Sequence, residues 1–267
     1  MKSGFVEIGE NRVFYYHYGE RGPKIVLLHG FGHFAQSLNF RSFLENMSDS
    51  YQILAFDLLA HGKSSNPTTP IGFEQHTRLM HQAAVKLGYT RYNLIGYSFG
   101  GWISMRLAAI YRENVEKLVI VDIIPRVYDK PQKVTIESGV PNEFKDTESA
   151  VDWISSRYPD IPRDYFYSKL ENMFFKEEND TWGMSSHPSR KSQLVMDGDG
   201  WQYIRNIKVP AMIIRGSKSQ LAVIDEVNKM KEMMDYLRVV SINSADHNVP
   251  FTHLDQFEKA IREFIPS

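Results

Sequence analysis

The segment Leu94-Ile95-Gly96-Tyr97-Ser98-Phe99-Gly100-Gly101-Trp102 decides how this sequence is interpreted. The apolar run at residues 92–95 is typical of a buried strand, and the pattern at 103–107 indicates a helix that follows at once. Ser98 would therefore lie at the tip of a tight strand-to-helix turn, with its hydroxyl exposed as a nucleophile. The flanking glycines would let strand and helix approach closely, and the helix N-terminus would place partial positive charge beside a developing oxyanion.

A second loop complements this serine. The apolar run 25–28 leads into His29-Gly30-Phe31-Gly32. An oxyanion formed by attack on a carbonyl needs two backbone donors, and we expect them to be the N–H groups of Phe31 and Phe99. We interpret His29 as a side chain that braces this loop rather than as a catalytic base.

Strand-sized and helix-sized patterns alternate around these loops. Short β-rich runs, several of them apolar at consecutive residues, predict strands at 24–28, 52–56, 92–95, 117–121, 211–215 and 238–242. Apolar residues at three- and four-residue spacing predict helices at 73–87, 221–234 and 254–264, with Gly88 ending the first. An antiparallel hairpin is expected at 5–18. The alternation predicts an α/β fold with a mainly parallel sheet and helices on both faces.

The alternation stops between residues 126 and 208. This stretch has few β-branched runs, five prolines and many aromatic and methionine side chains. It predicts an inserted helical cap, so that residues 1–125 and 209–267 would form the core. We expect the cap to shape a substrate pocket, with Trp153, Phe174 and Phe175 as candidate lining residues. The alternative is that these aromatic side chains form a small core of the insertion itself.

A further motif, at residues 57–64, completes an ordered set of motifs along the chain. Asp57-Leu58-Leu59-Ala60-His61-Gly62-Lys63-Ser64 follows the predicted strand at 52–56. Together with the His-Gly loop, Gly-x-Ser-x-Gly and a late histidine, it resembles the α/β-hydrolase superfamily from His29 to the C-terminal helix, with the insertion unmatched in detail. The resemblance implies the α/β-hydrolase fold with serine-esterase-like chemistry. It also implies that Asp57 and His61 structure their loop and do not catalyse.

The late histidine is His247, in the loop between the last predicted strand and the terminal amphipathic helix. The resemblance implies that it reaches Ser98, takes the serine proton and later returns it to the leaving group. The alternative is a surface-loop histidine without a catalytic role. We interpret the neighbouring Asp246 as a turn residue.

The acid that would orient this histidine is not at its usual place. The commoner pattern of the superfamily is Gly-x-x-Asp after the strand at 211–215, and this sequence has Gly216-Ser217-Lys218-Ser219. Serine cannot carry the charge that stabilises an imidazolium. We predict Asp122, at the end of the strand 117–121, because some members carry the acid there and it keeps the order Ser, Asp, His. Asp225 is the alternative, and a damaged triad marked by Ser219 is a third possibility.

Interpretations from other classes remain open at this point. Gly30-Phe31-Gly32-His33-Phe34-Ala35 fits a dinucleotide-binding pattern, with Asp57 about 20 residues further on, but an NAD-binding oxidoreductase leaves Ser98 and His247 without a role. A weakly catalytic ligand receptor on the same fold is also compatible, because a fold does not determine a function. Serine at 98 excludes members with a carboxylate nucleophile, and no His-Glu-x-x-His zinc motif occurs.

Composition limits the remaining partners. A formal net charge of -1 argues against nucleic acid, and the lack of cysteine excludes a disulfide, a thiol nucleophile and a thiolate metal site. No apolar run approaches the roughly 20 residues of a membrane span. We therefore expect a cytoplasmic serine hydrolase, monomeric or homodimeric, that needs no cofactor or metal and binds no membrane. Its substrate would be a small, mostly apolar carboxylic ester, with lactones, amides or activated C–C bonds as alternatives.

Overall fold

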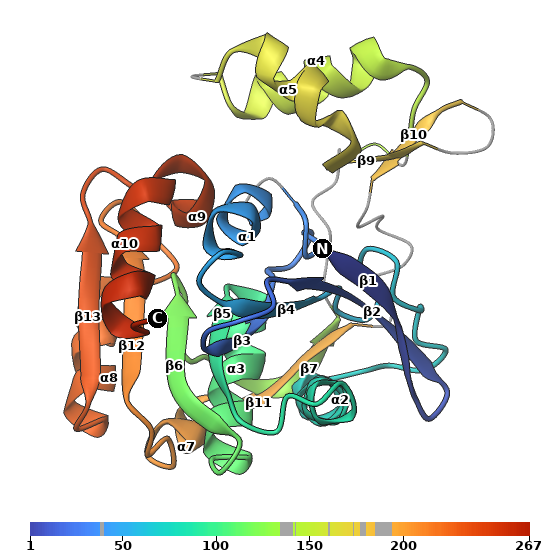
Figure 1. Cartoon of the computed structure of the whole chain (residues 1–267). Helices are drawn as coiled ribbons and strands as arrows, with labels where there is room; N and C mark the ends of the chain where they lie inside the picture. The colour runs from blue at the N-terminus through green and yellow to red at the C-terminus, as the bar shows by residue number, and fades with distance from the viewer. Residues whose placement is uncertain are drawn as a thin grey trace.

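An eight-stranded sheet in the order β1-β2-β4-β3-β5-β6-β12-β13 forms the centre of the molecule in the computed structural model (Figure 1). The structure describes residues 1–37, 40–133, 141, 143–159, 161–172, 174–176, 180–184 and 194–267. The strands are β1 (Lys2–Ile8), β2 (Asn11–Tyr18), β3 (Lys24–Leu28), β4 (Gln52–Phe56), β5 (Tyr92–Tyr97), β6 (Val115–Val121), β12 (Ala211–Gly216) and β13 (Leu237–Ile242). The hairpin β1–β2 and the pair β2–β4 are antiparallel, and every other pair is parallel. The predicted fold class is confirmed.

Helices cover both faces of this sheet. One face carries α2 (Phe73–Lys86), α3 (Phe99–Ile110) and α8 (Ile224–Met233), whose buried side chains share a cluster with Val26 and Leu28. The other face carries α1 (Arg41–Met47) and α10 (Leu254–Phe264), which pack with Ile25 and Leu27. Successive side chains of a strand point to opposite faces, so a run of consecutive apolar residues such as β3 supplies both halves of the core.

The insertion between β6 and β12 is not purely helical, and this corrects the sequence-based expectation. Besides α4 (Thr147–Arg157), α5 (Arg163–Lys169) and a 3₁₀ turn (Leu170–Asn172), it contains β8 (Glu143–Phe144), β9 (Phe174–Lys176) and β10 (Trp182–Met184), which form a small sheet. β7 (Val127–Lys133) pairs with β11 (Val195–Asp199). These strands are short, and β7 contains Pro131, which a two-stranded ladder tolerates because its outer edges are unpaired. Local periodicity therefore did not reveal them.

The two parts of the insertion pack differently. The β7–β11 ladder lies on the core, where Val195 N donates to Ile71 O at 3.0 Å and Phe73 N donates to Asp197 Oδ1 at 2.9 Å. The remainder, α4, α5 and β8 to β10, is called the cap below, and it has a hydrophobic cluster of its own. Figure 1 shows the cap above the side of the core where α1 and α9 (Val249–Thr252) lie.

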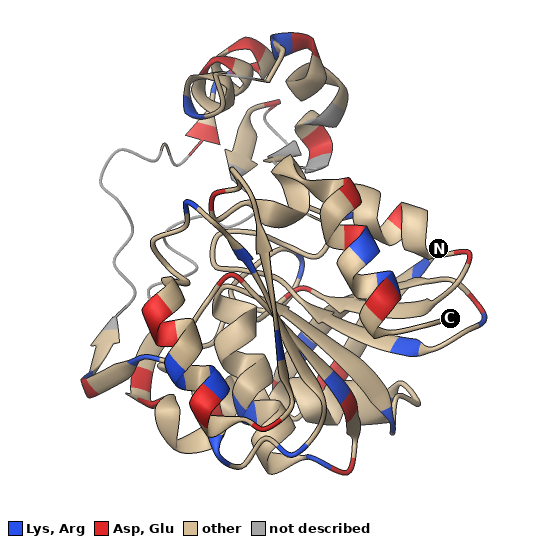
Figure 2. Ribbon diagram, turned by 90° about the vertical axis from the view of Figure 1, so that its left-hand side faces the viewer, with Lys and Arg blue, Asp and Glu red and all other residues tan. Residues whose placement is uncertain are grey.

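Charged side chains follow the outside of this arrangement. Figure 2 shows acidic and basic residues interspersed along the helices and loops, while the central strands are mostly without charge. Within the part of the chain that the structure describes, every helix is too short or too polar to cross a membrane.

His76 on α2 predicts a measurable pH dependence of stability. The side chain is fully buried, its Nδ1 donates to Gly72 O at 3.1 Å, and burial lowers its pKa to about 4 from 6.5. Stability from the neutral ring is therefore present above pH 6.5 and is lost as the pH falls toward 4. We expect the free energy of unfolding of the wild type, relative to His76→Gln, to fall by about 3 kcal/mol between pH 7 and pH 4.

Urea denaturation of both proteins across this pH range measures the effect. The comparison with a variant is needed because the titration of Asp57 changes the free energy of unfolding in the direction opposite to that of His76. Burial raises the pKa of Asp57 to about 6, so its contribution to stability grows as the pH falls from 6 toward 4. Both proteins retain Asp57, and its contribution cancels. Parallel pH profiles would contradict the assignment to His76.

Candidate active site

Ser98 lies at the turn between β5 and α3 in a conformation that non-glycine residues rarely adopt. Its backbone angles are φ 51° and ψ -115°. The turn is anchored on both sides, because Ser98 N donates to Val121 O at 3.0 Å and Gly101 N donates to Ser98 O at 2.8 Å. Strained backbone of this kind persists only where the surroundings hold it, and it is concentrated at functional sites.

Close contacts explain the glycines on either side of Ser98. A Cβ on Gly96 would lie 2.1 Å from Ser104 Oγ, and a Cβ on Gly100 would lie 2.3 Å from the backbone oxygen of Leu28. The first turn of α3 thus approaches β5 and the end of β3 more closely than any side chain would permit.

His29 braces the loop that follows β3. Its ring is fully buried, Nε2 accepts the N–H of Leu58 at 2.9 Å, and Nδ1 donates to Gly30 O at 2.8 Å. These contacts fix the tautomer and engage both ring nitrogens. His29 therefore has the loop-bracing contacts expected from its position.

Asp57 and His61 hold the neighbouring loop through backbone groups. The carboxylate of Asp57 accepts the N–H groups of Ala35 at 2.8 Å and Lys63 at 2.9 Å. Nε2 of His61 accepts the N–H of Gly32 at 3.2 Å. The loop that carries Phe31 is thereby tied to the end of β4.

Phe31 and Phe99, the residues expected to donate to an oxyanion, come from adjacent segments. Phe31 directly precedes the braced Gly32, and Phe99 is the first residue of α3. Their rings are in contact, with centroids 6.1 Å apart. The N–H groups of the first helical turn have no acceptor within their helix, so a helix N-terminus is suited to an anion.

His247 connects Ser98 to Asp122. Its Nε2 lies 3.0 Å from Ser98 Oγ, and its Nδ1 lies 2.7 Å from Asp122 Oδ2. Because a carboxylate only accepts, Nδ1 carries the proton and Nε2 is left to accept from the serine hydroxyl. The imidazole is 27% exposed and the acid is fully buried, so only the histidine is open to an approaching molecule.

The carboxylate of Asp122 also receives donors from the loop after β12. Gly216 N donates to Oδ1 at 2.8 Å, and Ser219 Oγ donates to Oδ2 at 2.5 Å. Ser219, at the position where the commoner pattern has an acid, therefore contacts Asp122 directly. Asp225 lies in the first turn of α8 with an exposed side chain, while Nδ1 of His247 is engaged by Asp122.

Three contributors to the site escaped the sequence analysis: Tyr97, Gly216 and Ser219 as a donor. The ring of Tyr97 stacks on the imidazole of His247, with centroids 4.9 Å apart and an interplanar angle of 26°. Tyr97 is the first of the two variable residues of Gly-x-Ser-x-Gly, and its position next to Ser98 is the signal that could have pointed to it. No local sequence pattern predicts the roles of Gly216 and Ser219, because their partners are far away in the sequence.

Two of the three aromatic residues proposed to line the pocket, Trp153 and Phe174, pack in the hydrophobic cluster of the cap. Phe174 is 2% exposed and packs against Phe144, with ring centroids 5.1 Å apart. Trp153 packs against the same ring at 5.5 Å. Phe175 belongs to β9, and its side chain lies outside the described part of the structure. Trp153 and Phe174 therefore fit the alternative left open by the sequence, in which these aromatic side chains form a small core of the insertion itself.

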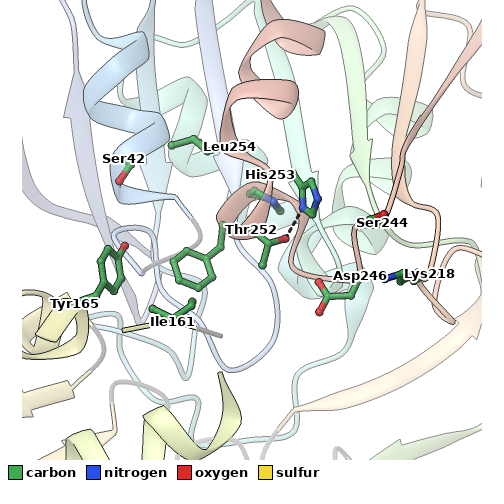
Figure 3. A pocket seen from close by; sticks show the side chains of 11 residues that line it. Ser42, Ile161, Tyr165, Lys218, Ser244, Asp246, Thr252, His253 and Leu254 are labelled. Atoms are coloured by element: carbon green, nitrogen blue, oxygen red, sulfur yellow. Dashed lines mark hydrogen bonds between the residues drawn. The ribbon is translucent and has the colours of Figure 1, made fainter. Parts of the chain in front are cut away.

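A cleft of about 640 Å³ separates the cap from the core beside the His247 loop. Figure 3 shows Tyr165 and Ile161 on the cap side, with Thr252 and Asp246 on the core side. Phe251 contacts the cap through Tyr165, with ring centroids 6.0 Å apart. Asp246 directly precedes His247 in the chain, but neither His247 nor Ser98 lines this cleft. Among the described residues, no three His, Asp or Glu side chains are grouped so that they could hold a metal ion.

Comparison with known proteins identifies the family. The profile of the alpha/beta hydrolase fold family matches residues 23–254. This chain belongs to that family. It is 25% identical over 250 residues to 2-(acetamidomethylene)succinate hydrolase of Mesorhizobium japonicum, covering 91% of this chain and 88% of the relative. It is 23% identical over 264 residues to a putative esterase/lipase of Haemophilus influenzae, covering 91% and 83%.

Solved structures agree with this assignment. The crystal structure of E-2-(acetamidomethylene)succinate hydrolase superposes with a TM-score of 0.82 at 23% identity, covering 100% of this chain and 99% of the other. The likeness at this identity concerns the fold. By family and by the names of its relatives, the protein is a hydrolase.

Gly216→Ala should displace the loop that carries His247. A Cβ at this position would lie 2.1 Å from Asp246 O and 2.6 Å from Ala245 O, and backbone cannot yield as a flexible side chain can. Overpacking of this kind costs about 1–3 kcal/mol. We expect thermal denaturation to show a loss of stability in that range.

Gly4→Ala is the matched control, because its Cβ would meet only the end of the Tyr15 side chain at 3.2 Å. It should unfold like the wild type. Unchanged stability of Gly216→Ala would contradict the close approach of Gly216 to the backbone of residues 245 and 246.

Proposed function

We propose that this protein is a serine hydrolase that cleaves carboxylic esters of small, mostly apolar substrates through an acyl-enzyme intermediate. The observation that carries the proposal is the hydrogen-bonded line from Ser98 through His247 to Asp122, with separations of 3.0 and 2.7 Å. Such a line is the arrangement by which a serine hydroxyl becomes a nucleophile at neutral pH.

The proposed mechanism uses each side chain at a stated atom. Ser98 Oγ attacks the acyl carbon while its proton passes to Nε2 of His247. Asp122 holds the proton on Nδ1 and stabilises the imidazolium that results. The N–H groups of Phe31 and Phe99 would receive the oxyanion, aided by the dipole of α3.

Collapse of this intermediate releases the alcohol and leaves an ester on Ser98. The proton on Nε2 passes to the alcohol oxygen as its bond to the acyl carbon breaks. A water molecule then attacks the acyl group and gives its proton to Nε2. The second collapse returns that proton to Ser98 and releases the acid.

The preference for small apolar substrates is supported by the surroundings of Ser98. The partly buried ring of Phe31 packs against Phe99, the residue that follows Ser98. The cleft between the cap and the core, which Asp246 lines, has apolar walls from Ile161, Tyr165 and Phe251. We include in the proposal that the insertion at residues 126–208, which contains the cap, shapes the pocket over a core of 1–125 and 209–267.

Lactones, amides and activated C–C bonds are open to the same nucleophile. A panel of p-nitrophenyl esters of increasing acyl length, a lactone and an amide separates these chemistries by kcat/KM. The Mesorhizobium japonicum relative is named for 2-(acetamidomethylene)succinate, and that compound belongs in the panel. The fastest turnover is expected for short-chain esters.

Ser98→Ala should abolish turnover and leave the fold intact, because only Oγ is lost. A fluorophosphonate probe should label the wild type at Ser98, as peptide mass spectrometry would show. Circular dichroism of the variant provides the control for folding. Labelling that persists in Ser98→Ala would refute the assignment of the nucleophile.

Asp122→Asn should lower kcat by about 10⁴ with KM nearly unchanged, because the orienting acid acts on the chemical step. Asparagine also suits the φ of 50° at this position. Asp225→Asn is the matched control and should retain wild-type kinetics. Reversed outcomes would assign the acid to Asp225, and two unimpaired variants would favour a weakly catalytic receptor.

A further inference from the structure

The hydroxyl of Ser219 is placed between two hydrogen-bonding partners. It is 4% exposed, its Oγ accepts the N–H of Leu221 at 3.1 Å, and it donates to Asp122 Oδ2. The same oxygen of Asp122 receives Nδ1–H of His247 at 2.7 Å. One carboxylate oxygen thus takes both side-chain donors, and the other takes Gly216 N at 2.8 Å.

This arrangement restrains the carboxylate in a way that the backbone alone does not. The Leu221 N–H occupies a lone pair of Ser219 Oγ, which orients the hydroxyl proton toward Asp122. With Oδ1 held by Gly216 and Oδ2 held by Ser219, rotation of the carboxylate about its Cβ–Cγ bond would break two hydrogen bonds. Oδ2 therefore stays in line with the imidazole.

We propose that Ser219 is a positioning residue for the acid, acting through Asp122 on His247. The inference rests on the function proposed above and adds a residue to it. Its geometric support is that Ser219 Oγ and His247 Nδ1 contact the same carboxylate oxygen, at 2.5 and 2.7 Å.

Ser219→Ala tests the positioning role. A hydrogen bond to a charged group contributes enough for its loss to lower kcat by roughly tenfold or more, with KM unchanged. Ser219→Thr keeps the hydroxyl and should restore most of kcat. Ser217→Ala is the matched control on the same loop, because Ser217 Oγ accepts Ser244 N at 3.0 Å and serves a different partner; it should behave as the wild type.

A spectroscopic measurement separates positioning from a general loss of structure. The proton on Nδ1 of His247 gives a low-field NMR signal whose position reports its hydrogen bond to Asp122. We expect this signal to shift in Ser219→Ala and to remain in place in Ser217→Ala. An unshifted signal together with wild-type kcat would overturn the positioning role.

These outcomes are distinct from failure of the proposed function. If the fluorophosphonate labels Ser98 and Asp122→Asn is impaired while Ser219→Ala keeps wild-type kcat and an unshifted Nδ1 signal, only the inference on Ser219 is overturned. If the wild type neither turns over the ester panel nor labels at Ser98, the proposed function and this inference are both overturned.

Discussion

The buried carboxylate of Asp122 is the interaction on which the rest of the site depends. A charge without solvent must be paired or hydrogen-bonded, and each of its donors comes from a different part of the chain: Gly216 at the end of β12, Ser219 in the next loop and His247 after β13. Asp122 follows β6, which lies between β5 and β12 in the sheet. Its carboxylate therefore has Ser98, at the end of β5, on one side and the donors that follow β12 on the other. The order of strands thus decides which side chains meet.

Steric limits keep these segments at the required separation. Gly96 and Gly100 let α3 approach the sheet behind Ser98, and Gly216 lets the end of β12 pass beneath the backbone of residues 245 and 246. At each place a Cβ would meet atoms closer than 3 Å. The glycines therefore bring Ser98 and the histidine loop to fixed positions on one end of the sheet, where open α/β sheets gather their functional groups.

The cap is organised on a different principle. Its cluster around Phe144 and Phe174 is separate from the two clusters of the core, and its ring contacts with the core run from Tyr158 and Tyr165 to Phe251. Phe251 lies in α9, four residues after His247. The insertion and the histidine loop are therefore neighbours in space, and both contribute to one cleft.

The amino-acid sequence by itself determined the elements whose signals are local. Runs of apolar residues such as 24–28 and 52–56 predicted β3 and β4 with their observed bounds, and Gly-x-Ser-x-Gly placed Ser98 at a strand-to-helix turn. The sequence left open which carboxylate contacts His247, and it allowed Ser219 to be interpreted as the mark of a damaged triad. It did not predict the strands of the insertion. Only the tertiary structure decided these points, because Asp122 lies 125 residues from His247 and 97 from Ser219 in the chain. Contacts at such separations follow from the order of strands in the sheet, which no local pattern encodes.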